Sequence, residues 1–328
     1  MDKSQAYDQT VSDIRPNVKF EGWLLVKEAR VRATAGGKSF LDVAFVDRTG
    51  AIPAKFWDWT GEAPAAGTVA MVRGVGNEYN GHLQLRVDSF RPAAPGDGKD
   101  PSGFVPAAPE TAGSMMAEIS ATADALRDDS LRGIVHKLLE WASAGGRLAA
   151  APAAKSMHHA EVSGLLHHTV TMLRAAKALC AVYPELDKDL LFAGVIAHDL
   201  AKIDEMNVGA TGLVDGYTRD GRLVGHIVRG VVNVERAGGA VGAARERTTL
   251  LQHLVLSHHG DAEFGSPVPP KCPEALVLSC IDRLDAKLFQ MFAAARETKP
   301  GEFSAPVWGL DKIEVYRAEP PPPPSSDT

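Results

Sequence analysis

The sequence predicts an α+β protein with two domains, a small β-barrel followed by a helical domain. Alternating apolar residues and frequent turn residues are typical of strands over residues 17–92, whereas apolar residues recur at helical spacing after residue 114. Residues 91–113 between them are dense in Pro, Gly and Ala, as in a linker. A length of 328 residues also suits two domains.

Five strands are expected in the first domain. They are the runs VKFEGWLLVKEARVRAT, KSFLDVAFVD, AIPAKFWDW, TVAMVRGVGNEY and HLQLRVDSFRP. Asn80-Gly81 lies between the last two runs, and this dipeptide is the strongest short signal for a β-hairpin. A short helix could fit between Gly61 and Gly67. This set of short strands suits the five-stranded barrel of the OB-fold.

The second domain is expected to be all-α. Helical patterns occur at 115–143, 162–182, 188–203, 226–237, 245–258 and 273–296. The predicted domain boundaries are an N-terminal extension over 1–14, the barrel over 15–92, a linker over 93–113 and the helical domain over 114–317. Residues 318–328 contain a proline run and are predicted to form a disordered tail.

Composition excludes several classes of protein. The net charge of -6 lies entirely in residues 101–328, because residues 1–100 carry 13 Lys and Arg against 13 Asp and Glu. The acidic balance argues against a protein that coats nucleic acid. Three cysteines are too few for a disulfide framework or a Cys-rich zinc site. With no apolar signal segment and no run near the ~20 residues of a membrane span, we expect a cytoplasmic protein without a membrane partner.

Histidine and aspartate pairs mark a candidate metal site. A single histidine on a helix is more often structural than a ligand. His198-Asp199 is different, because it follows the apolar stretch LLFAGVIA, and adjacent ionisable groups there are costly unless they are paired or bound to metal. Imidazole and carboxylate together suit Mn, Fe, Co, Ni or Zn, and the lack of nearby thiols argues against a structural zinc site.

The order of His168, His198-Asp199 and Asp282 resembles the H…HD…D pattern of the HD superfamily of metal-dependent phosphohydrolases. Extra histidines before the last aspartate resemble members that hold two metals, which suits phosphodiester hydrolysis. Over residues 15–315 the chain is also similar to the YhaM family, which joins an N-terminal OB-fold to an HD domain and consists of 3′→5′ exoribonucleases. The similar blocks are HHAEVSGLLHHTVTMLRAA, FAGVIAHDLAKI, YTRDGRLVGHIVRG and HLVLSHHGDAEFGSPVPPKCPEALVLSCIDRLDAKL.

The resemblance implies a role for each matching residue. The core metal ligands would be His168, His198, Asp199 and Asp282, with Asp199, also assigned as catalytic, bridging two ions. A second metal, or phosphate, would contact His226, His258 and His259. Lys202 would hold the scissile phosphate if its helix continues past His198. The implied cofactor is one or two divalent ions, Mn²⁺ first, with Co²⁺, Fe²⁺, Ni²⁺ or Mg²⁺ as alternatives.

Some positions keep two interpretations. His158 and His159 would contact phosphate or form a helix-cap region under the site. Asp285 would contact substrate ribose or hydrogen-bond a metal ligand. The chain departs from the family pattern at residue 167, which is His where an acidic or aromatic residue is common, and at Ala201, which replaces a glycine. His253 is expected to be structural.

The predicted barrel carries residues suited to single-stranded nucleic acid, which OB-folds bind by base stacking and phosphate contacts. The candidates are Phe40, Phe56, Trp57, Trp59 and Tyr79, with Lys38, Arg48, Lys55, Arg73 and Arg86. About half of the aromatics are expected to fill the barrel instead. Strand alternation in KFWDW predicts that Lys55, Trp57 and Trp59 share the stacking face.

These expectations lead to one function and two alternatives. The first is a metal-dependent 3′→5′ exoribonuclease that degrades single-stranded RNA to 5′-mononucleotides, with single-stranded DNA as a further substrate. The second is an HD phosphohydrolase of free nucleotides whose barrel serves oligomerisation. The third is a non-catalytic RNA-binding protein. Since HD domains often associate, a homo-oligomer is also expected.

Overall fold

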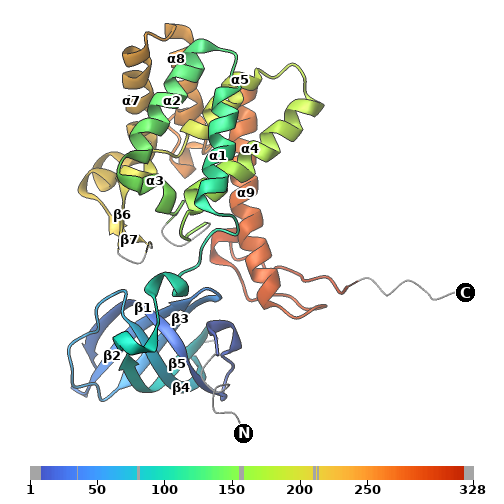
Figure 1. Cartoon of the computed structure of the whole chain (residues 1–328). Helices are drawn as coiled ribbons and strands as arrows, with labels where there is room; N and C mark the ends of the chain where they lie inside the picture. The colour runs from blue at the N-terminus through green and yellow to red at the C-terminus, as the bar shows by residue number, and fades with distance from the viewer. Residues whose placement is uncertain are drawn as a thin grey trace, which may run out of the picture. The chain divides into compact units, whose positions relative to one another are not determined.

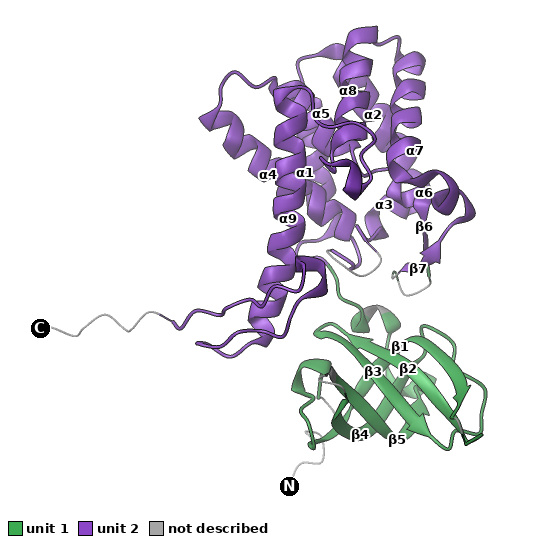
Figure 2. Ribbon diagram, turned by 180° about the vertical axis from the view of Figure 1, so that it is seen from behind, with its two compact units in different colours: residues 1–107, 208–213 green, residues 108–207, 214–328 purple. Residues whose placement is uncertain are grey.

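The computed structural model describes residues 9–34, 36–79, 82–154, 159–209, 212 and 214–320, apart from the side chains of His82 and Ser102. The chain forms two compact units, residues 1–107 with 208–213 and residues 108–207 with 214–328 (Figure 2). Their boundary lies inside the predicted linker. Most of the predicted extension and tail, the dipeptide Asn80-Gly81 and His158 lie outside the described residues.

The first unit contains a closed five-stranded barrel, as predicted (Figure 1). The strands are β1 (Lys19–Ala33), β2 (Ser39–Asp47), β3 (Gly50–Trp57), β4 (Val69–Tyr79) and β5 (His82–Pro92). They are arranged in the order β1-β2-β3-β5-β4, and β4 pairs with β1 to close the barrel. Only the pairing of β3 with β5 is parallel among these described strands. This is the order of an OB-fold.

Two local predictions for the barrel have different outcomes. Tyr79 pairs directly with His82, so the hairpin predicted between β4 and β5 is confirmed by the strands on either side of the turn. The helix that could fit between Gly61 and Gly67 is absent, because residues 58–68 form turns and irregular structure. The barrel interior is apolar, with Leu24, Phe45 and Leu85 fully buried.

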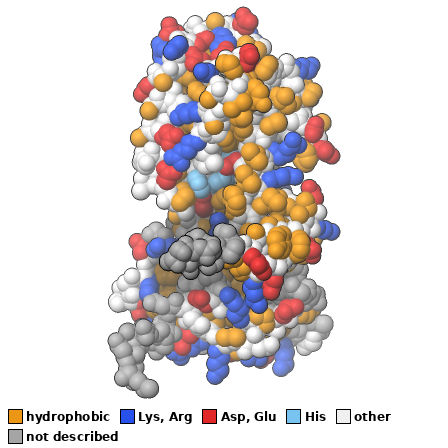
Figure 3. All heavy atoms as spheres, turned by 90° about the vertical axis from the view of Figure 1, so that its right-hand side faces the viewer, with side chains coloured by type: hydrophobic (Ala, Val, Ile, Leu, Met, Phe, Trp, Pro, Cys, Tyr) orange, Lys and Arg blue, Asp and Glu red, His pale blue; other side chains and the backbone are white. Residues whose placement is uncertain are grey.

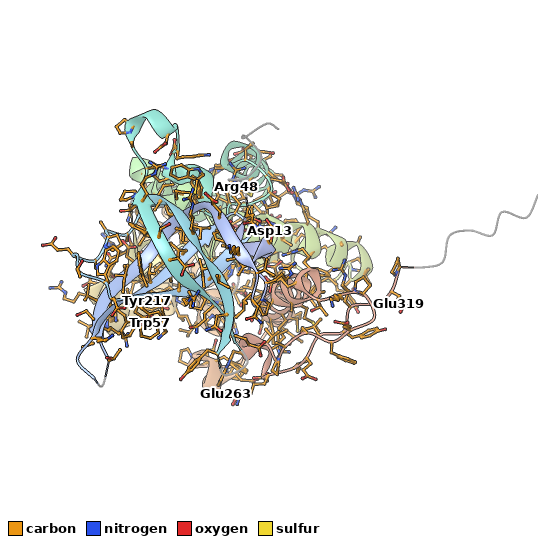
Figure 4. The ribbon with its side chains drawn as sticks, turned by 90° about the horizontal axis from the view of Figure 1, so that it is seen from below. Asp13, Arg48, Trp57, Tyr217, Glu263 and Glu319 are labelled. Atoms are coloured by element: carbon orange, nitrogen blue, oxygen red, sulfur yellow. The ribbon has the colours of Figure 1, made fainter. Side chains whose placement is uncertain are left out.

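Short 3₁₀ turns pack on the barrel. The turn η1 (Val11–Asp13) lies against the loop between β2 and β3, since Val11 N–H donates to Asp47 Oδ2 (2.7 Å) and Ser12 N–H to Thr49 Oγ1 (3.0 Å). Figure 4 labels Asp13 and Arg48 on these neighbouring segments. The turns η2 (Pro95–Asp97) and η3 (Pro101–Phe104) follow β5, and Gly103 accepts a hydrogen bond from Arg48 Nε (2.7 Å).

The second unit is helical (Figure 1). Its helices are α1 (Ala112–Asp124), α2 (Asp129–Ser143), α3 (Arg147–Ala150), α4 (Gly164–Val182), α5 (Lys188–Ala197), α6 (Lys202–Glu205), α7 (Arg219–Val241), α8 (Arg245–Ser257) and α9 (Pro273–Glu297), with 3₁₀ turns η4 (Ala144–Gly146), η5 (Ala262–Phe264) and η6 (Trp308–Leu310). The pattern predicted at 115–143 is two helices, because Asp128 starts the second by accepting from Leu131 N–H (2.9 Å). The prediction of an all-α unit is wrong in one place, since β6 (Met206–Val208) pairs with β7 (Val214–Tyr217).

Helices α5 and α8 pack closely against each other. A Cβ atom at Gly194 on α5 would lie 2.3 Å from Leu254 Cδ2 on α8, so the two backbones approach closely there. Leu191, Leu254 and Leu278 are fully buried in this core. Both helices end at histidines, His198 and His258, whose ring centroids lie 5.0 Å apart. No helix among the described residues is long and apolar enough to cross a membrane.

Candidate metal centre and nucleic-acid interface

Three of the predicted ligands meet in a first cluster, consisting of His168 on α4, His198 at the end of α5 and Asp282 on α9. His168 Nε2 lies 3.3 Å from His198 Nε2 and 3.3 Å from Asp282 Oδ1. All three residues offer ligand atoms that lie within 4.8 Å of one another. Such separations match those between ligands of one metal ion.

A second cluster consists of His226, His258 and His259, whose ligand atoms also lie within 4.8 Å of one another. His258 and His259 follow α8 directly, and their rings lie 4.2 Å apart between centroids. His226 comes from α7, where Gly225 has a φ of 73° that interrupts the helix just before the histidine. This φ favours glycine, and it turns the first residues of α7 away from the direction of the rest.

Asp199 links the two clusters. Its Oδ2 lies 3.4 Å from His198 Nε2 and 3.7 Å from His168 Nε2. Its Oδ1 lies 3.5 Å from His226 Nε2 and 3.7 Å from His258 Nε2. The carboxylate therefore directs one oxygen to each cluster, which is the arrangement of a bridging ligand in a two-metal site. Histidine side chains also gather at one place on the surface of the helical unit (Figure 3).

The five histidines of the two clusters share one orientation, in which Nδ1 donates to a nearby oxygen and Nε2 faces the centre. The acceptors are Asp285 Oδ2 for His168, Val195 O for His198, Glu205 for His226, Val255 O for His258 and Phe264 O for His259, at 2.7–3.0 Å. A proton on Nδ1 leaves the lone pair of a neutral ring on Nε2. Metal-binding histidines are typically oriented in this way.

Three buried polar atoms of the centre have no hydrogen-bond partner, namely Asp199 Oδ1, His226 Nε2 and His258 Nε2. Leaving such atoms unpaired in a buried site costs free energy, so they require a partner. All three are acceptors that face one another, and a cation satisfies them together. Since the donor set is imidazole and carboxylate without thiol, the residues fit a divalent transition metal ion.

Charge also favours a cation in this centre. Burial lowers the pKa of His168, but hydrogen bonds with Asp282 and Asp285 outweigh burial and raise this pKa to about 9. Burial acts to raise the pKa of Asp199, yet the charges of Lys202 and His198 hold it well below its usual value. Asp199 thus has Lys202 as a positive partner, whereas Asp282 is balanced either by a proton on His168 or by a metal ion.

Lys202 reaches the centre by a different route from the one predicted. Its predicted position requires α5 to continue, but α5 ends at Ala197 and Lys202 begins the separate helix α6. The turn between them still brings Lys202 Nζ to 2.6 Å from Asp199 Oδ2. The lysine is 8% exposed; burial acts to lower its pKa, but the charge of Asp199 outweighs burial and raises it, so the centre contains a buried cation.

On the barrel, an aromatic and cationic face lies on β2 and β3. The exposed Trp57 packs on Phe40 with ring centroids 5.0 Å apart, and Lys55 Nζ lies 5.0 Å from the Phe40 ring centroid. Lys55 is paired in register with Arg86 on β5. Since paired residues point to the same side of a sheet, these four side chains share one outer face. OB-folds bind single strands on the surface of strands 2 and 3.

The prediction that Trp59 shares this face is wrong. β3 ends at Trp57, and Asp58 has a φ of 56°, which breaks the alternation before residue 59. Trp59 packs on Phe56 and Phe90, with centroids 5.2 and 6.1 Å away, against the barrel core. Of the other predicted cations, Arg73 is ion-paired to Glu21 at 2.6 Å and Arg86 is paired to Asp88 at 3.6 Å.

Comparisons with known proteins agree with this architecture. Residues 165–287 match the HD domain family. A relative named "3'-5' exoribonuclease YhaM" from Geobacillus sp. (strain WCH70) is 38% identical over 298 residues, which are 90% of this chain and 90% of the relative. The chain belongs to the YhaM family. It is a hydrolase in which an OB-fold barrel precedes an HD domain.

Two solved structures resemble a part of this YhaM-family chain. One is a solution NMR structure of the second OB-fold domain of replication protein A from Methanococcus maripaludis, and the other is a crystal structure of a domain of the same protein. Each is 20% identical and covers 26% of this chain, with 91% and 92% of the solved chains covered and TM-scores of 0.22 and 0.23.

Sequence reasoning missed one residue of the metal centre. Glu205 on α6 receives hydrogen bonds from both the ring and the backbone N–H of His226, with Nδ1 at 3.1 and 3.0 Å from its two oxygens and the backbone nitrogen at 3.2 Å. A carboxylate six residues after Asp199 is the only sequence signal for it, and such residues are common on helix surfaces. Only the packing of α6 beside α7 shows that Glu205 contacts His226.

Replacing Glu205 with Gln should weaken metal binding at the second cluster about 10- to 100-fold, because the ring of His226 loses its charged acceptor. Competition of Mn²⁺ with a fluorescent chelator measures this affinity without reference to turnover. Glu140→Gln on α2 is the matched control, since Glu140 is exposed and lies outside both clusters. Equal Mn²⁺ affinity in wild type and Glu205→Gln would contradict an orienting role.

Two of the residues with alternative predicted roles, His159 and Asp285, lie next to each other and near His168. Asp285 Oδ2 accepts from His168 Nδ1 (2.7 Å) and from His159 Nε2 (2.8 Å), so this carboxylate hydrogen-bonds a predicted ligand. His159 is buried beside it, whereas His158 lies outside the described residues. His253 is outside both clusters, and its Nε2 accepts from Lys271 N–H (2.9 Å).

Proposed function

We propose that the chain is a metal-dependent 3′→5′ exoribonuclease that hydrolyses single-stranded RNA to 5′-mononucleotides. The observation that carries this proposal is the pair of ligand clusters joined by Asp199. It occurs in a chain that is 38% identical to a relative named for this activity. A site of this kind suits the hydrolysis of a phosphodiester bond.

The residues of the centre would have different roles in hydrolysis. Divalent ions bound at the two clusters would supply a water of lowered pKa and positive charge for the phosphate. The first and second clusters, joined by Asp199, would hold these ions; a mixed imidazole and carboxylate set suits Mn²⁺, Fe²⁺, Co²⁺, Ni²⁺ or Zn²⁺, and Mn²⁺ is the first ion to test. The buried ammonium of Lys202 would bind a phosphate oxygen and stabilise the charge that develops on it.

The outer face of β2 and β3 would hold the nucleic acid strand. Trp57 offers an exposed ring for base stacking and packs on the buried Phe40, and Lys55 and Arg86 offer charges for the phosphates. Neither contact depends on a 2′-hydroxyl, so single-stranded DNA is a further substrate. The asymmetry between a neutral first unit and an acidic second one predicts moderate, salt-sensitive affinity.

A strand-polarity assay tests the proposal. With Mn²⁺ present, a 3′-labelled oligoribonucleotide should lose its label at once as a 5′-mononucleotide, while a 5′-labelled one should shorten through a ladder. Chelation should stop both reactions, and Mn²⁺, Co²⁺, Fe²⁺, Ni²⁺ or Mg²⁺ can then be compared in restoring them. If free nucleotides were hydrolysed while RNA stayed intact, the alternative of a nucleotide phosphohydrolase would be favoured. If RNA were bound but nothing were hydrolysed, the non-catalytic RNA-binding protein would be favoured.

Truncating Trp57 tests the nucleic-acid face. Trp57→Ala should weaken the binding of a single-stranded RNA about 5- to 150-fold, because one stacked base contributes about 1–3 kcal/mol. Fluorescence anisotropy in the presence of chelator measures binding without cleavage. Trp308→Ala is the control, since Trp308 is an exposed tryptophan outside the barrel. Unchanged affinity in Trp57→Ala would rule out this face.

A further inference from the structure

A cavity of about 290 Å³ in the helical unit is not explained by the proposed hydrolysis. It is lined by residues of α2, α3, α6 and α7 and of the turn before α6. Helix α2 contacts both α3 and α7, and α6 contacts α7 (Figure 1). Small-molecule sites in proteins usually have volumes of about 300–1,000 Å³, so this cavity has the size for one small ligand.

One short segment of the chain separates this cavity from the metal centre. Lys202 N–H donates to Asp199 O (2.9 Å), and Ile203 N–H donates to Leu200 O (3.3 Å), so the segment begins as a 3₁₀-type turn. In such a turn, residues three apart lie on the same side. Asp199, Lys202 and Glu205 accordingly belong to the metal centre. Leu200 and Ile203 line the cavity instead, and none of the predicted metal ligands does.

One part of the cavity lining is apolar and contains an aromatic ring. Leu138 and Ala142 of α2 are buried there. Trp141, Leu200 and Ile203 are partly buried and pack against the same hydrophobic core. An indole is large and rigid, and aromatic rings pack favourably at centroid distances of about 4.5–7 Å. This part of the cavity therefore suits a flat aromatic ring.

The polar side chains of the lining carry an excess of positive charge. Arg147 is ion-paired to Asp204 (2.9 Å), so these two charges balance. Arg236 has its guanidinium carbon 5.9 Å from the Trp141 ring centroid, and no carboxylate of a described residue pairs with it. Within the described part of the chain, the indole N–H of Trp141 and the side-chain amide of Asn233 also have no hydrogen-bond partner. An unpaired guanidinium beside such donors favours a ligand with an acidic group.

We propose that this cavity binds a nucleoside monophosphate. The base packs against Trp141 in the apolar part of the cavity, and the phosphate accepts hydrogen bonds from Arg236. A guanidinium fork suits a phosphate because it can donate two parallel hydrogen bonds. A mononucleotide is also the product of the exonuclease reaction proposed above, and in this respect the choice of ligand rests on that function. The cavity holds such a product outside the metal centre.

The NMR signals of the indole N–H groups locate the ligand. The purified full-length chain is kept in chelator and titrated with adenosine monophosphate (AMP), and the Trp141 signal is identified by its loss in Trp141→Phe. AMP should shift the Trp141 signal until it saturates. A constant Trp141 signal with shifts of Trp57 or Trp59 would place AMP on the barrel, and a spectrum without any shift would show that no AMP is bound. Either result would overturn the proposal.

Calorimetry in the same buffer tests the role of each part of the ligand. Arg236→Gln should bind AMP about 10- to 150-fold more weakly than wild type, the usual effect of losing a hydrogen bond to a charged group. Arg219→Gln is the matched control, since Arg219 is an exposed arginine of α7 that does not line the cavity. Adenosine, which lacks the phosphate, and inorganic phosphate, which lacks the ring, should each bind more weakly than AMP.

Two results of this calorimetry would contradict the proposal. The first is wild-type affinity for AMP in Arg236→Gln, and the second is inorganic phosphate that binds as tightly as AMP. None of these measurements requires turnover. A chain that binds AMP at Trp141 but leaves RNA intact would therefore retain this site and refute the nuclease, and the converse result would retain the nuclease alone.

Discussion

Replacing Asp199 with Asn is expected to lower kcat on single-stranded RNA by about 1000-fold or more. The asparagine keeps the shape of the side chain but removes the charge that faces both clusters through Oδ1 and Oδ2. Loss of a bridging carboxylate removes several kcal/mol of stabilisation of the charged transition state, and each 1.36 kcal/mol is tenfold in rate. Single-turnover kinetics with saturating Mn²⁺ measure the change.

The control separates this effect from a general change of charge. Asp311→Asn makes the same replacement at an exposed position, where a φ of 56° accommodates asparagine well. It should retain wild-type kcat and Mn²⁺ stoichiometry. Asp199→Asn should also bind less Mn²⁺ while its thermal unfolding stays cooperative. Undiminished turnover in a pure Asp199→Asn preparation would exclude the centre as the site of hydrolysis.

Replacing Lys202 with Met is expected to lower turnover without weakening metal binding. The variant should lose about 100- to 1000-fold in kcat, the usual consequence of removing one preorganised group that stabilises developing negative charge. Its Mn²⁺ affinity should equal or exceed that of wild type. The reason is that Lys202 Nζ, 2.6 Å from Asp199 Oδ2, competes with a metal ion for the same oxygen.

Steady-state kinetics and chelator competition together test this split. Lys287→Met on α9 is the matched control, because Lys287 is half-exposed, pairs only weakly with Asp311 and belongs to neither cluster. It should leave both quantities unchanged. If kcat of Lys202→Met were normal, Lys202 would serve only as a counter-charge for the buried carboxylates. If both kcat and Mn²⁺ affinity fell, its role would be structural.

The sequence was informative about the centre because four of its seven predicted ligands come in two adjacent pairs. Neighbouring residues inside a helix point about 100° apart, so they cannot easily serve one site. His198-Asp199 and His258-His259 each stand where a helix ends, and there the chain can direct both side chains to the same centre. A pair of adjacent ionisable residues at the end of an apolar helix therefore predicts that both side chains reach the same site. Alternation and turn residues likewise predicted the five strands of the barrel.

What escaped prediction depends on local backbone angles and tertiary contacts. The positive φ of Asp58 reverses the face of Trp59, and no alternation pattern reveals such an angle. Glu205 and Glu161 look like ordinary surface carboxylates until α6, α7 and the loop before α4 are placed next to histidines. The small sheet of β6 and β7 interrupts a helical region in segments too short for a recognisable period.

The ends of α5 and α8 have a further electrostatic consequence. Peptide dipoles add along a helix to about half a negative charge at its C-terminus. Both helices end at the metal centre, where Val195 O and Val255 O receive the Nδ1 protons of His198 and His258. Each terminus favours a nearby cation by about 0.3–1 kcal/mol. The backbone itself thus gives the centre a preference for positive ions that no side-chain substitution removes.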